Sequence, residues 1–577
     1  MKKFVIGLVT GLVLAGMVLI IGALVIAKLG EGRPSIANDG TLILRLEGPI
    51  PERAPIDTIF PLLGGTHAVT VVDVWQSLRR AAADPKVKAV VLMPRALEVG
   101  WAKLQEIRGD LQEFKKSGKP LLVFLRAPRT PEYYLATAAD KIYMVPEDIL
   151  DMKGLRAELT YFTGAMEKVG VKLEAEHAGK YKDALDSFTR TSMTPETREV
   201  LNSMLDGLYG DLIHTVSTAR KMTLEETRSL IDNGPFLAEE AVKNKLVDAT
   251  LYEDQFFDLV SKAIGGAPVK RIALTDYVKA ATDEGTHKIA VIVSEGGIIR
   301  GGSVDPPFST ETSITVANSV KTLRQVGSDE SIRGVILRVD SPGGDAVASD
   351  EILREVKLLS KKKPLIISMS DVAASGGYYI SMTGDPVLAY PNTITGSIGV
   401  IFGKINLRGL YEKLGVKKEV VQRGENATID SEYFELTPEG RTKLRNGVES
   451  VYKTFVQIVA DSRKKEYAEI HQLAQGRVWL GSQAKENGLV DELGGLDRAM
   501  EMIKDKAKIG RQEQVQIVVY PPRRTLLDQL FTKTAPSDDN APNVMIRKYV
   551  HEITGLPLEM WEGRGFLKLM PFRIEAR

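Results

Sequence analysis

Ser375 stands where a strand-like run meets a predicted helix, in the string DVAASGGYY at residues 371–379. Glycines at such a junction let the backbone turn sharply, and they leave amide groups free at a helix N-terminus, where they stabilise negative charge. A serine at this place is therefore a candidate nucleophile with hydrogen-bond donors beside it. The competing interpretation is a structural serine that caps the helix.

A second glycine-rich turn follows the strand-like run 335–339 and reads SPGGD at residues 341–345. Its glycine pair, Gly343 and Gly344, exposes backbone N–H groups of the kind that an oxyanion hole requires. The competing interpretation is an ordinary turn, in which glycine and proline serve only the backbone.

The chain contains its own pattern twice. EKVGVK at 167–172 returns as EKLGVK at 412–417, 245 positions later (412 − 167), and the tyrosine pair at 133–134 returns at 378–379. A period of this size indicates two copies of a whole domain rather than a solenoid of short repeats. The copies can therefore be compared position by position.

Both candidate turns occur only in the second copy. Where the second copy has Ser375-Gly376-Gly377, the first has Thr130-Pro131-Glu132, and the stretch that matches the glycine pair reads RALE at 95–98. Proline has no N–H to donate at that point. The first copy has thus lost the candidate nucleophile and its donors.

A serine is a weak nucleophile until a base accepts its proton. Of the six histidines, only His471 lies within the folded part of the second copy, in an ordinary polar helical stretch. A lysine can be the base if burial lowers its pKa, which gives the Ser–Lys form of the triad. Lys182 of the first copy, in GKYKDA at 179–184, aligns with Ala427 of the second. Each copy therefore has one partner that the other lacks, which predicts one site built from both. The competing interpretation of Lys182, taken alone, is a solvated surface lysine.

Ser397, in TGSIG at residues 395–399, is a candidate for orienting that lysine. Its hydroxyl can accept a hydrogen bond from a neutral amine, and the matching stretch of the first copy, 152–154, has no serine. The alternative is a turn residue.

Strands and helices must alternate to position these residues. Within each copy, short β-branched apolar runs alternate with helix-period stretches, as in 289–293 and 346–359. This pattern predicts an α/β fold with mostly parallel strands. We expect tandem domains at 40–265 and 285–510, and a C-terminal tail of unassigned role at 511–577.

An apolar N-terminal segment precedes both copies. Phe4 to Ala27 is 24 residues without a charge, which as a helix spans about 36 Å, enough to cross a bilayer. Lys2 and Lys3 precede it, so residues 1–28 are expected to form a cytoplasmic stub and a single transmembrane anchor, with the rest beyond the membrane. A cleaved signal peptide is the alternative.

Composition narrows the function classes. The chain has 577 residues, which suggests several domains, and a net charge of +1, which gives no support to nucleic-acid binding. It has no cysteine, so thiol nucleophiles, disulfides and cysteine metal sites are excluded. No H-E-x-x-H motif is present, and we expect neither a metal nor a cofactor.

The strings SPGG, AASGGYY and TGSIG in the second copy, with GKYKDA in the first, resemble the signal peptide peptidase A (protease IV) group of the S49 serine peptidases in its long two-domain form. The resemblance runs from the anchor to about residue 510. It implies a Clp-protease/crotonase-like fold in each copy. It also implies a homotetramer on the periplasmic side of the bacterial cytoplasmic (inner) membrane, which degrades signal peptides left after precursor cleavage.

By this resemblance, Ser375 is the nucleophile, Lys182 the general base and Ser397 the residue that holds the lysine, while the amides of Gly343, Gly344 and Gly376 bind the oxyanion. The lysine motif departs from the family pattern, because it reads Gly-Lys-Tyr-Lys rather than Gly-Thr-Tyr-Lys. Lys180 is thus a second candidate base, although alternation along the backbone would point its side chain the other way.

The expected function is a membrane-anchored Ser–Lys endopeptidase. A crotonase-like acyl-CoA enzyme would share the fold and the glycine amides, but it needs no Ser–Lys pair and gains nothing from an anchor. A catalytically inactive membrane scaffold of the same fold is a third possibility, and it predicts loss of the Ser375 motif, which is intact.

Overall fold

The computed structural model describes residues 34–54, 68–281, 285–300, 313–522 and 565–570, together with the isolated residues 11, 16 and 22. Apart from those three residues, the expected anchor at 1–28 lies outside the described residues, as does most of the tail. None of the helices in the described ranges combines the length and the apolar character that a membrane crossing requires.

The first copy is built on a parallel six-stranded sheet in the order β8-β4-β3-β2-β1-β9. Its central strands are nearly continuous apolar runs because helices cover both faces, as parallel sheets require. In β3 all five residues are buried. The strands are β1 (Gly40–Gly48), β2 (Val87–Leu97), β3 (Leu121–Leu125), β4 (Lys141–Met144), β8 (Ala249–Thr250) and β9 (Lys270–Ala273). The helices around them are α2 (Val71–Ala83), α3 (Trp101–Lys115), α4 (Thr130–Ala136), α10 (Glu253–Ala263) and α11 (Leu274–Lys279).

The second copy repeats this plan around strands in the order β19-β17-β15-β13-β10-β21, with β16 and β20 beside β15. The strands are β10 (His287–Glu295), β13 (Ile332–Ser341), β15 (Leu365–Ala374), β16 (Val387–Ala389), β17 (Ile394–Gly396), β19 (Val478–Leu480), β20 (Glu492–Leu493) and β21 (Val515–Tyr520). The helices are α12 (Val316–Ser328), α13 (Ala346–Ser360), α14 (Gly376–Ile380), α18 (Gly481–Glu486) and α19 (Leu496–Lys506). Strand β21 pairs with β10 as β9 pairs with β1, so each sheet gains an edge strand just beyond the boundary expected from the internal match.

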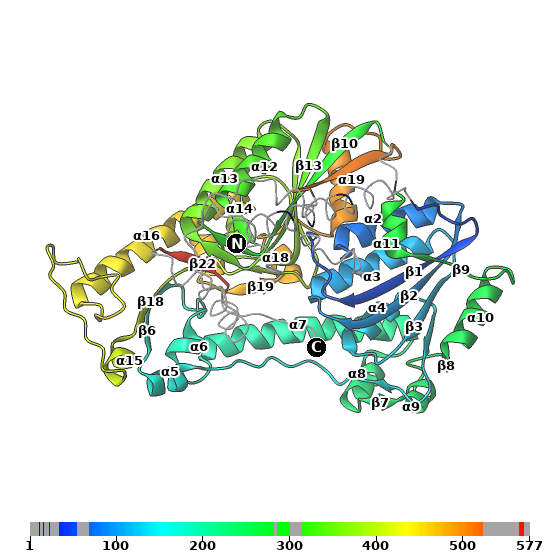
Figure 1. Cartoon of the computed structure of the whole chain (residues 1–577), viewed down its shortest axis with the longest axis horizontal. Helices are drawn as coiled ribbons and strands as arrows, with labels where there is room; N and C mark the ends of the chain where they lie inside the picture. The colour runs from blue at the N-terminus through cyan, green and yellow to red at the C-terminus, as the bar shows by residue number, and fades with distance from the viewer. Residues whose placement is uncertain are drawn as a thin grey trace.

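Among the described residues, two helices of equal length make the duplication visible (Figure 1). Helix α7 (Pro195–Arg220) and helix α16 (Pro438–Arg463) each have 26 residues. Each begins with proline, which needs no hydrogen-bond partner at that position, after a threonine whose side chain accepts an amide of the first turn. The α/β class and the duplication are therefore confirmed.

A third sheet joins the copies, in the order β12-β11-β14-β22-β18-β6. Strand β6 (Lys172–Ala178) of the first copy pairs antiparallel with β18 (Val400–Asn406) of the second along its whole length. The pairing delivers the loop that follows β6 to the second copy. The other strands are β11 (Gly297–Ile299), β12 (Ser313–Thr315), β14 (Gly343–Asp345) and β22 (Leu567–Leu569). Smaller elements are α5 (Thr163–Val169), α6 (Asp186–Thr189), α8 (Leu224–Asp232), α9 (Ala238–Lys243), α15 (Arg408–Lys413), α17 (Tyr467–Leu473), β5 (Ile149–Leu150) and β7 (Phe236–Leu237).

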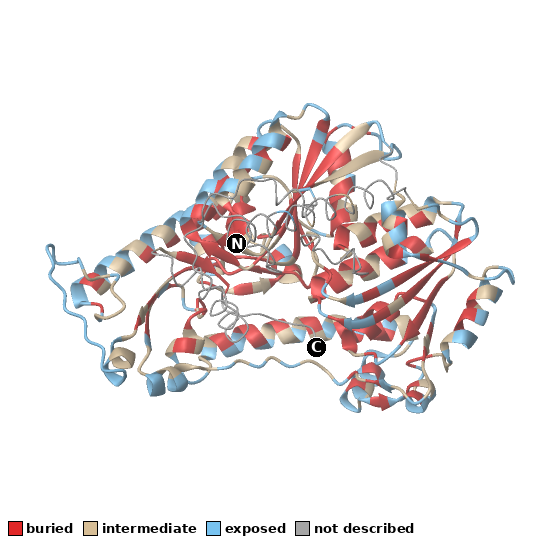
Figure 2. Cartoon of the chain, in the orientation of Figure 1, coloured by how far each residue is buried: buried red, intermediate tan, exposed pale blue. Residues whose placement is uncertain are grey.

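The two copies share buried contacts where they meet, so buried residues concentrate around the sheets and the junction (Figure 2). Arg338 of β13 is fully buried and pairs with Glu52 at 2.8 Å and with Glu106 of α3. Breaking a buried ion pair costs about 3–5 kcal/mol, because it leaves a charge without compensation. This cluster therefore holds the copies in one fixed relation.

Candidate active site

Ser375 lies in the sharp turn between β15 and α14. Its φ of 53° and ψ of −112° are an unusual backbone conformation for a residue with a side chain. The turn is held by hydrogen bonds, since the Ser375 N–H donates to the carbonyl of Gly396 at 2.8 Å and the Ser375 carbonyl accepts from Tyr379 at 2.8 Å. The hydroxyl makes no capping hydrogen bond to α14, so the structural capping interpretation does not apply.

Lys182 of the first copy meets Ser375 of the second. Its Nζ lies 2.9 Å from Ser375 Oγ, 2.8 Å from Ser397 Oγ and 2.8 Å from the Ser397 carbonyl oxygen. Both serines are fully buried and Lys182 is 2% exposed. The structure thus brings together three residues that the sequence analysis singled out from different parts of the chain.

Close approach of the second copy's backbone positions Lys182. The Tyr181 N–H donates to the carbonyl of Gln475 at 2.8 Å. A Cβ added at Gly476 would lie 2.6 Å from Lys182 Cβ, and one added at Gly399 would lie 2.9 Å from Lys182 Cδ. Any side chain at these two glycines would displace the lysine, so the loop before β18 and the loop before β19 together form its slot.

Burial lowers the pKa of Lys182 well below its ordinary value, and the carboxylate of Asp183 opposes this only in part. The same desolvation acts on Asp183 and raises its pKa to about 6. Lys180, two residues before, is exposed, and its Nζ lies 4.6 Å from the centre of the Tyr181 ring. Of the two lysines, only Lys182 reaches the serines.

The glycine pair lies against the start of α14. A Cβ added at Gly343 would lie 2.6 Å from the amide nitrogen of Gly376, and one added at Gly376 would lie 3.1 Å from that of Gly344. The φ values of Gly343 and Gly344, 101° and 152°, also favour glycine. The Gly343 N–H donates to Ser341 Oγ at 3.2 Å, and this single donor must leave Ser341 to bind an oxyanion.

The corresponding turn of the first copy is filled by a carboxylate. Glu132, fully buried, accepts the Leu97 N–H at 2.6 Å and the Arg129 N–H at 2.8 Å. Glu132 stands where the second copy has Gly377, and its role as an acceptor becomes visible only in the fold. The feature of the sequence that could have revealed this role is an acidic residue at a position that is glycine in the other copy.

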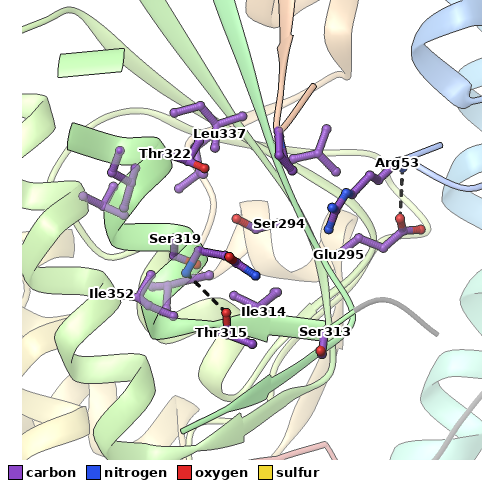
Figure 3. A pocket seen from close by; sticks show the side chains of 17 residues that line it. Arg53, Ser294, Glu295, Ser313, Ile314, Thr315, Ser319, Thr322, Leu337 and Ile352 are labelled. Carbon is purple, nitrogen blue, oxygen red and sulfur yellow. Dashed lines mark hydrogen bonds between the residues drawn. The ribbon is translucent and has the colours of Figure 1, made fainter. Parts of the chain in front are cut away.

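A separate pocket lies between β10, β12 and α12 (Figure 3). It is lined by apolar side chains such as Ile314 and Leu337 together with polar ones such as Ser294, and it includes none of the candidate catalytic residues. Its Thr315 accepts the Asn318 N–H at 3.3 Å as the cap of α12, and Glu295 accepts the Arg53 N–H at 2.9 Å. These groups serve the fold. In the described part of the chain, no group of three or more His, Asp or Glu residues is arranged to hold a metal ion.

A model of peptidase family S49 matches the chain twice, at residues 113–265 and 357–510. The chain belongs to this family. The predicted S49 membership is confirmed, and it makes the chain a serine peptidase rather than an acyl-CoA enzyme.

Curated S49 relatives match most of the chain. It is 35% identical over 463 residues to "Serine protease SPPA, chloroplastic" of Arabidopsis thaliana, covering 78% of this chain and 68% of that protein. It is 32% identical over 525 residues to "Protease 4" of Haemophilus influenzae, covering 86% and 84%. "Protease 4" of Salmonella typhi is 31% identical over 478 residues, covering 80% and 75%.

Among solved structures, a mutant of ClpP1 from Listeria monocytogenes aligns with a TM-score of 0.23 at 14% identity, over 36% of this chain and 94% of that chain. A likeness of this size carries no argument, so the Clp-protease/crotonase-like fold of each S49 copy stays a prediction.

Proposed function

We propose that this S49 chain is a serine endopeptidase in which Ser375 is the nucleophile and Lys182 the general base. The observation that supports the proposal most directly is the 2.9 Å contact between Lys182 Nζ and Ser375 Oγ within a fully buried cluster. A neutral amine has two N–H groups and one lone pair. If the carbonyl and hydroxyl oxygens of Ser397 accept the two N–H groups, the lone pair faces the Ser375 hydroxyl.

In the first step, Ser375 Oγ attacks the carbonyl carbon of the peptide bond while Lys182 takes the hydroxyl proton. The resulting oxyanion accepts hydrogen bonds from the amides of Gly343, Gly344 and Gly376. The Lys182 ammonium then gives its proton to the departing amine, and the acyl group stays on Ser375. A water molecule then attacks the acyl carbon while Lys182 takes its proton, and the Lys182 ammonium returns a proton to Ser375 Oγ as the ester bond breaks, which releases the carboxylic acid and restores the free serine.

For the substrate, we propose apolar peptides, and among them signal peptides left after precursor cleavage. A relative from Enterococcus faecium, 36% identical over 236 residues, is named "Putative signal peptide peptidase SppA". The uncharged run Phe4 to Ala27 supports a membrane anchor beside the place where such peptides remain. We further propose a homotetramer on the extracytoplasmic side of the cytoplasmic membrane.

The experiment is hydrolysis of an apolar fluorogenic peptide by the full chain in detergent, with wild type compared to Ser375→Ala. A fluorophosphonate probe, which reacts with activated serines, gives a second readout. Wild type should cleave the peptide and take up the probe, while Ser375→Ala should do neither. Equal hydrolysis by both proteins would overturn the assignment of Ser375, and an inert wild type would favour the scaffold.

A further inference from the structure

The C-terminal segment 565–570 lies in the third sheet, as strand β22 between β14 and β18 (Figure 1). It runs antiparallel to β14, with Leu569 opposite Gly343, and antiparallel to β18, with Leu567 opposite Ile401. Backbone hydrogen bonds continue the pairing at both ends. The Phe566 carbonyl accepts from Ala346 at 3.0 Å, and the Met570 N–H donates to the Pro342 carbonyl at 2.8 Å.

This path places the segment directly beside the Ser375 site. A Cβ added at Gly343 would collide with the carbonyl oxygen of Lys568, so this backbone lies against the turn that is the candidate oxyanion hole. Met570 is buried in the same apolar cluster as Ala374, the residue before Ser375. A peptidase must hold its substrate along such a path, with the substrate backbone beside β14 and the bond to be cleaved at the nucleophile.

The Lys568 side chain fills a buried pocket with aromatic walls. It is 2% exposed, with Nζ 3.1 Å from the centre of the Tyr379 ring and 5.3 Å from that of Phe455. Its hydrogen bond to the Ala346 carbonyl is long, at 3.4 Å. The nearby carboxylates have other partners, since Asp350 accepts from Tyr379 at 2.7 Å and Asp345 pairs with Arg300 at 3.0 Å. The ring faces attract the amine while burial disfavours its charge, so this pocket fits a lysine and also an apolar side chain of similar length.

The side chains before and after Lys568 point to the opposite face of the sheet and contact apolar residues. Leu567 and Leu569 belong to a cluster with Leu173, Phe188 and Ile401, to which both copies contribute. Backbone pairing along a strand edge with alternate side chains in pockets is a recurrent mode of peptide recognition. The contacts of residues 565–570 are therefore ones that a separate apolar peptide can make.

We propose that residues 565–570 are an intramolecular competitor that occupies the substrate cleft, so that a substrate peptide must displace them before cleavage. The inference rests on the proposed function, because it assigns the cleft beside Ser375 to substrate. It also gives the substrate a direction, antiparallel to β14, and a preference for a long apolar or lysine side chain that packs against the rings of Tyr379 and Phe455.

The test compares three proteins: the full chain, a chain ending after residue 564, which lacks β22, and a chain ending after residue 570, which keeps it. Hydrolysis of the apolar fluorogenic peptide is measured with all three. Loss of the competitor should lower KM at least tenfold in the chain ending after 564 and leave kcat nearly unchanged. The chain ending after 570 should behave like the full chain.

Two further measurements guard against a misfolded truncation. In the full chain, Met570→Pro removes the N–H that donates to Pro342 and should lower KM in the same way. A synthetic peptide of residues 565–570 should inhibit the chain ending after 564 competitively. Unchanged KM in Met570→Pro, or a folded truncated chain that the peptide does not inhibit, would make β22 a structural strand and overturn the proposal.

The fluorophosphonate probe separates this proposal from the proposed function. If all three proteins react with the probe at Ser375 and have the same KM, only the competitor fails. If none reacts and none cleaves, the peptidase assignment fails first.

Discussion

Lys182 Nζ lies 2.9 Å from Ser375 Oγ, although the two residues come from different copies of the duplicated domain. The pairing depends on the antiparallel match of β6 with β18, which brings the first copy's loop to the second copy's nucleophile turn. Neither copy alone contains both groups. Two copies that each lost one group are therefore joined into a single candidate site.

The pH dependence of hydrolysis should follow the ionisation of Lys182. Burial lowers its pKa, and only the neutral amine can accept the Ser375 proton, so activity should rise with pH and level off well below pH 10.5. Measurement of kcat/KM from about pH 5 to about pH 10 should show one ionisation on the acidic side. Activity that falls as the pH rises across this range would exclude a neutral lysine as base.

Ser397→Ala tests the residue that contacts Lys182 without touching substrate. Its hydroxyl supplies one of the two hydrogen bonds to the amine, and its backbone carbonyl remains after the change. A neutral hydrogen bond contributes about 0.5–1.5 kcal/mol, so kcat/KM should fall about 2- to 10-fold, mainly in kcat. The acidic limb of the pH profile should shift as well. A change in thermal stability alone, with the profile in place, would make Ser397 purely structural.

The affinity of the C-terminal competitor should also depend on pH. Burial lowers the pKa of Lys568 to about 7, whereas a lysine in the released segment keeps a pKa near about 10.4. The released segment thus binds more protons between these values, so docking should strengthen as pH rises from about 7 to about 10, by up to about tenfold per pH unit. Tyr379, Asp345 and Asp350 also face Lys568. They face both of the peptides compared below, so they affect the two affinities alike.

The measurement is the inhibition constant of the 565–570 peptide on the chain ending after residue 564, at about pH 7 and about pH 9. The matched control is the same peptide with the Lys568→Met change. At the lower pH it should bind more tightly than the unchanged peptide, and its affinity should be nearly independent of this ionisation. The ratio of the two inhibition constants at each pH removes any effect that the ionisation of Lys182 has on both peptides. A ratio that does not change with pH would contradict a buried neutral Lys568.

Comparison of the two copies in the sequence predicted the α/β duplication, and it selected the residues that the structure places together at the site. It selected Ser375 and Lys182, which lie within hydrogen-bonding distance in the structure, because each stands at a position where the other copy has a different residue. It could not place β22, because an apolar alternation predicts a strand but not the strand with which it pairs. The carboxylate of Glu132 was missed for a similar reason, since a buried charge is identified by its amide partners, which only the fold reveals.

Replacement of each of the two neighbouring lysines tests the central claim most directly. We measure kcat/KM of peptide hydrolysis for Lys182→Ala and, as the matched control, Lys180→Ala. Residues that act as a unit fail together, so Lys182→Ala should lose at least about 10⁴-fold, whereas the exposed Lys180 should be replaced with little loss. An active Lys182→Ala with an inactive Lys180→Ala would move the base two residues upstream, and full activity in both would contradict the Ser–Lys mechanism.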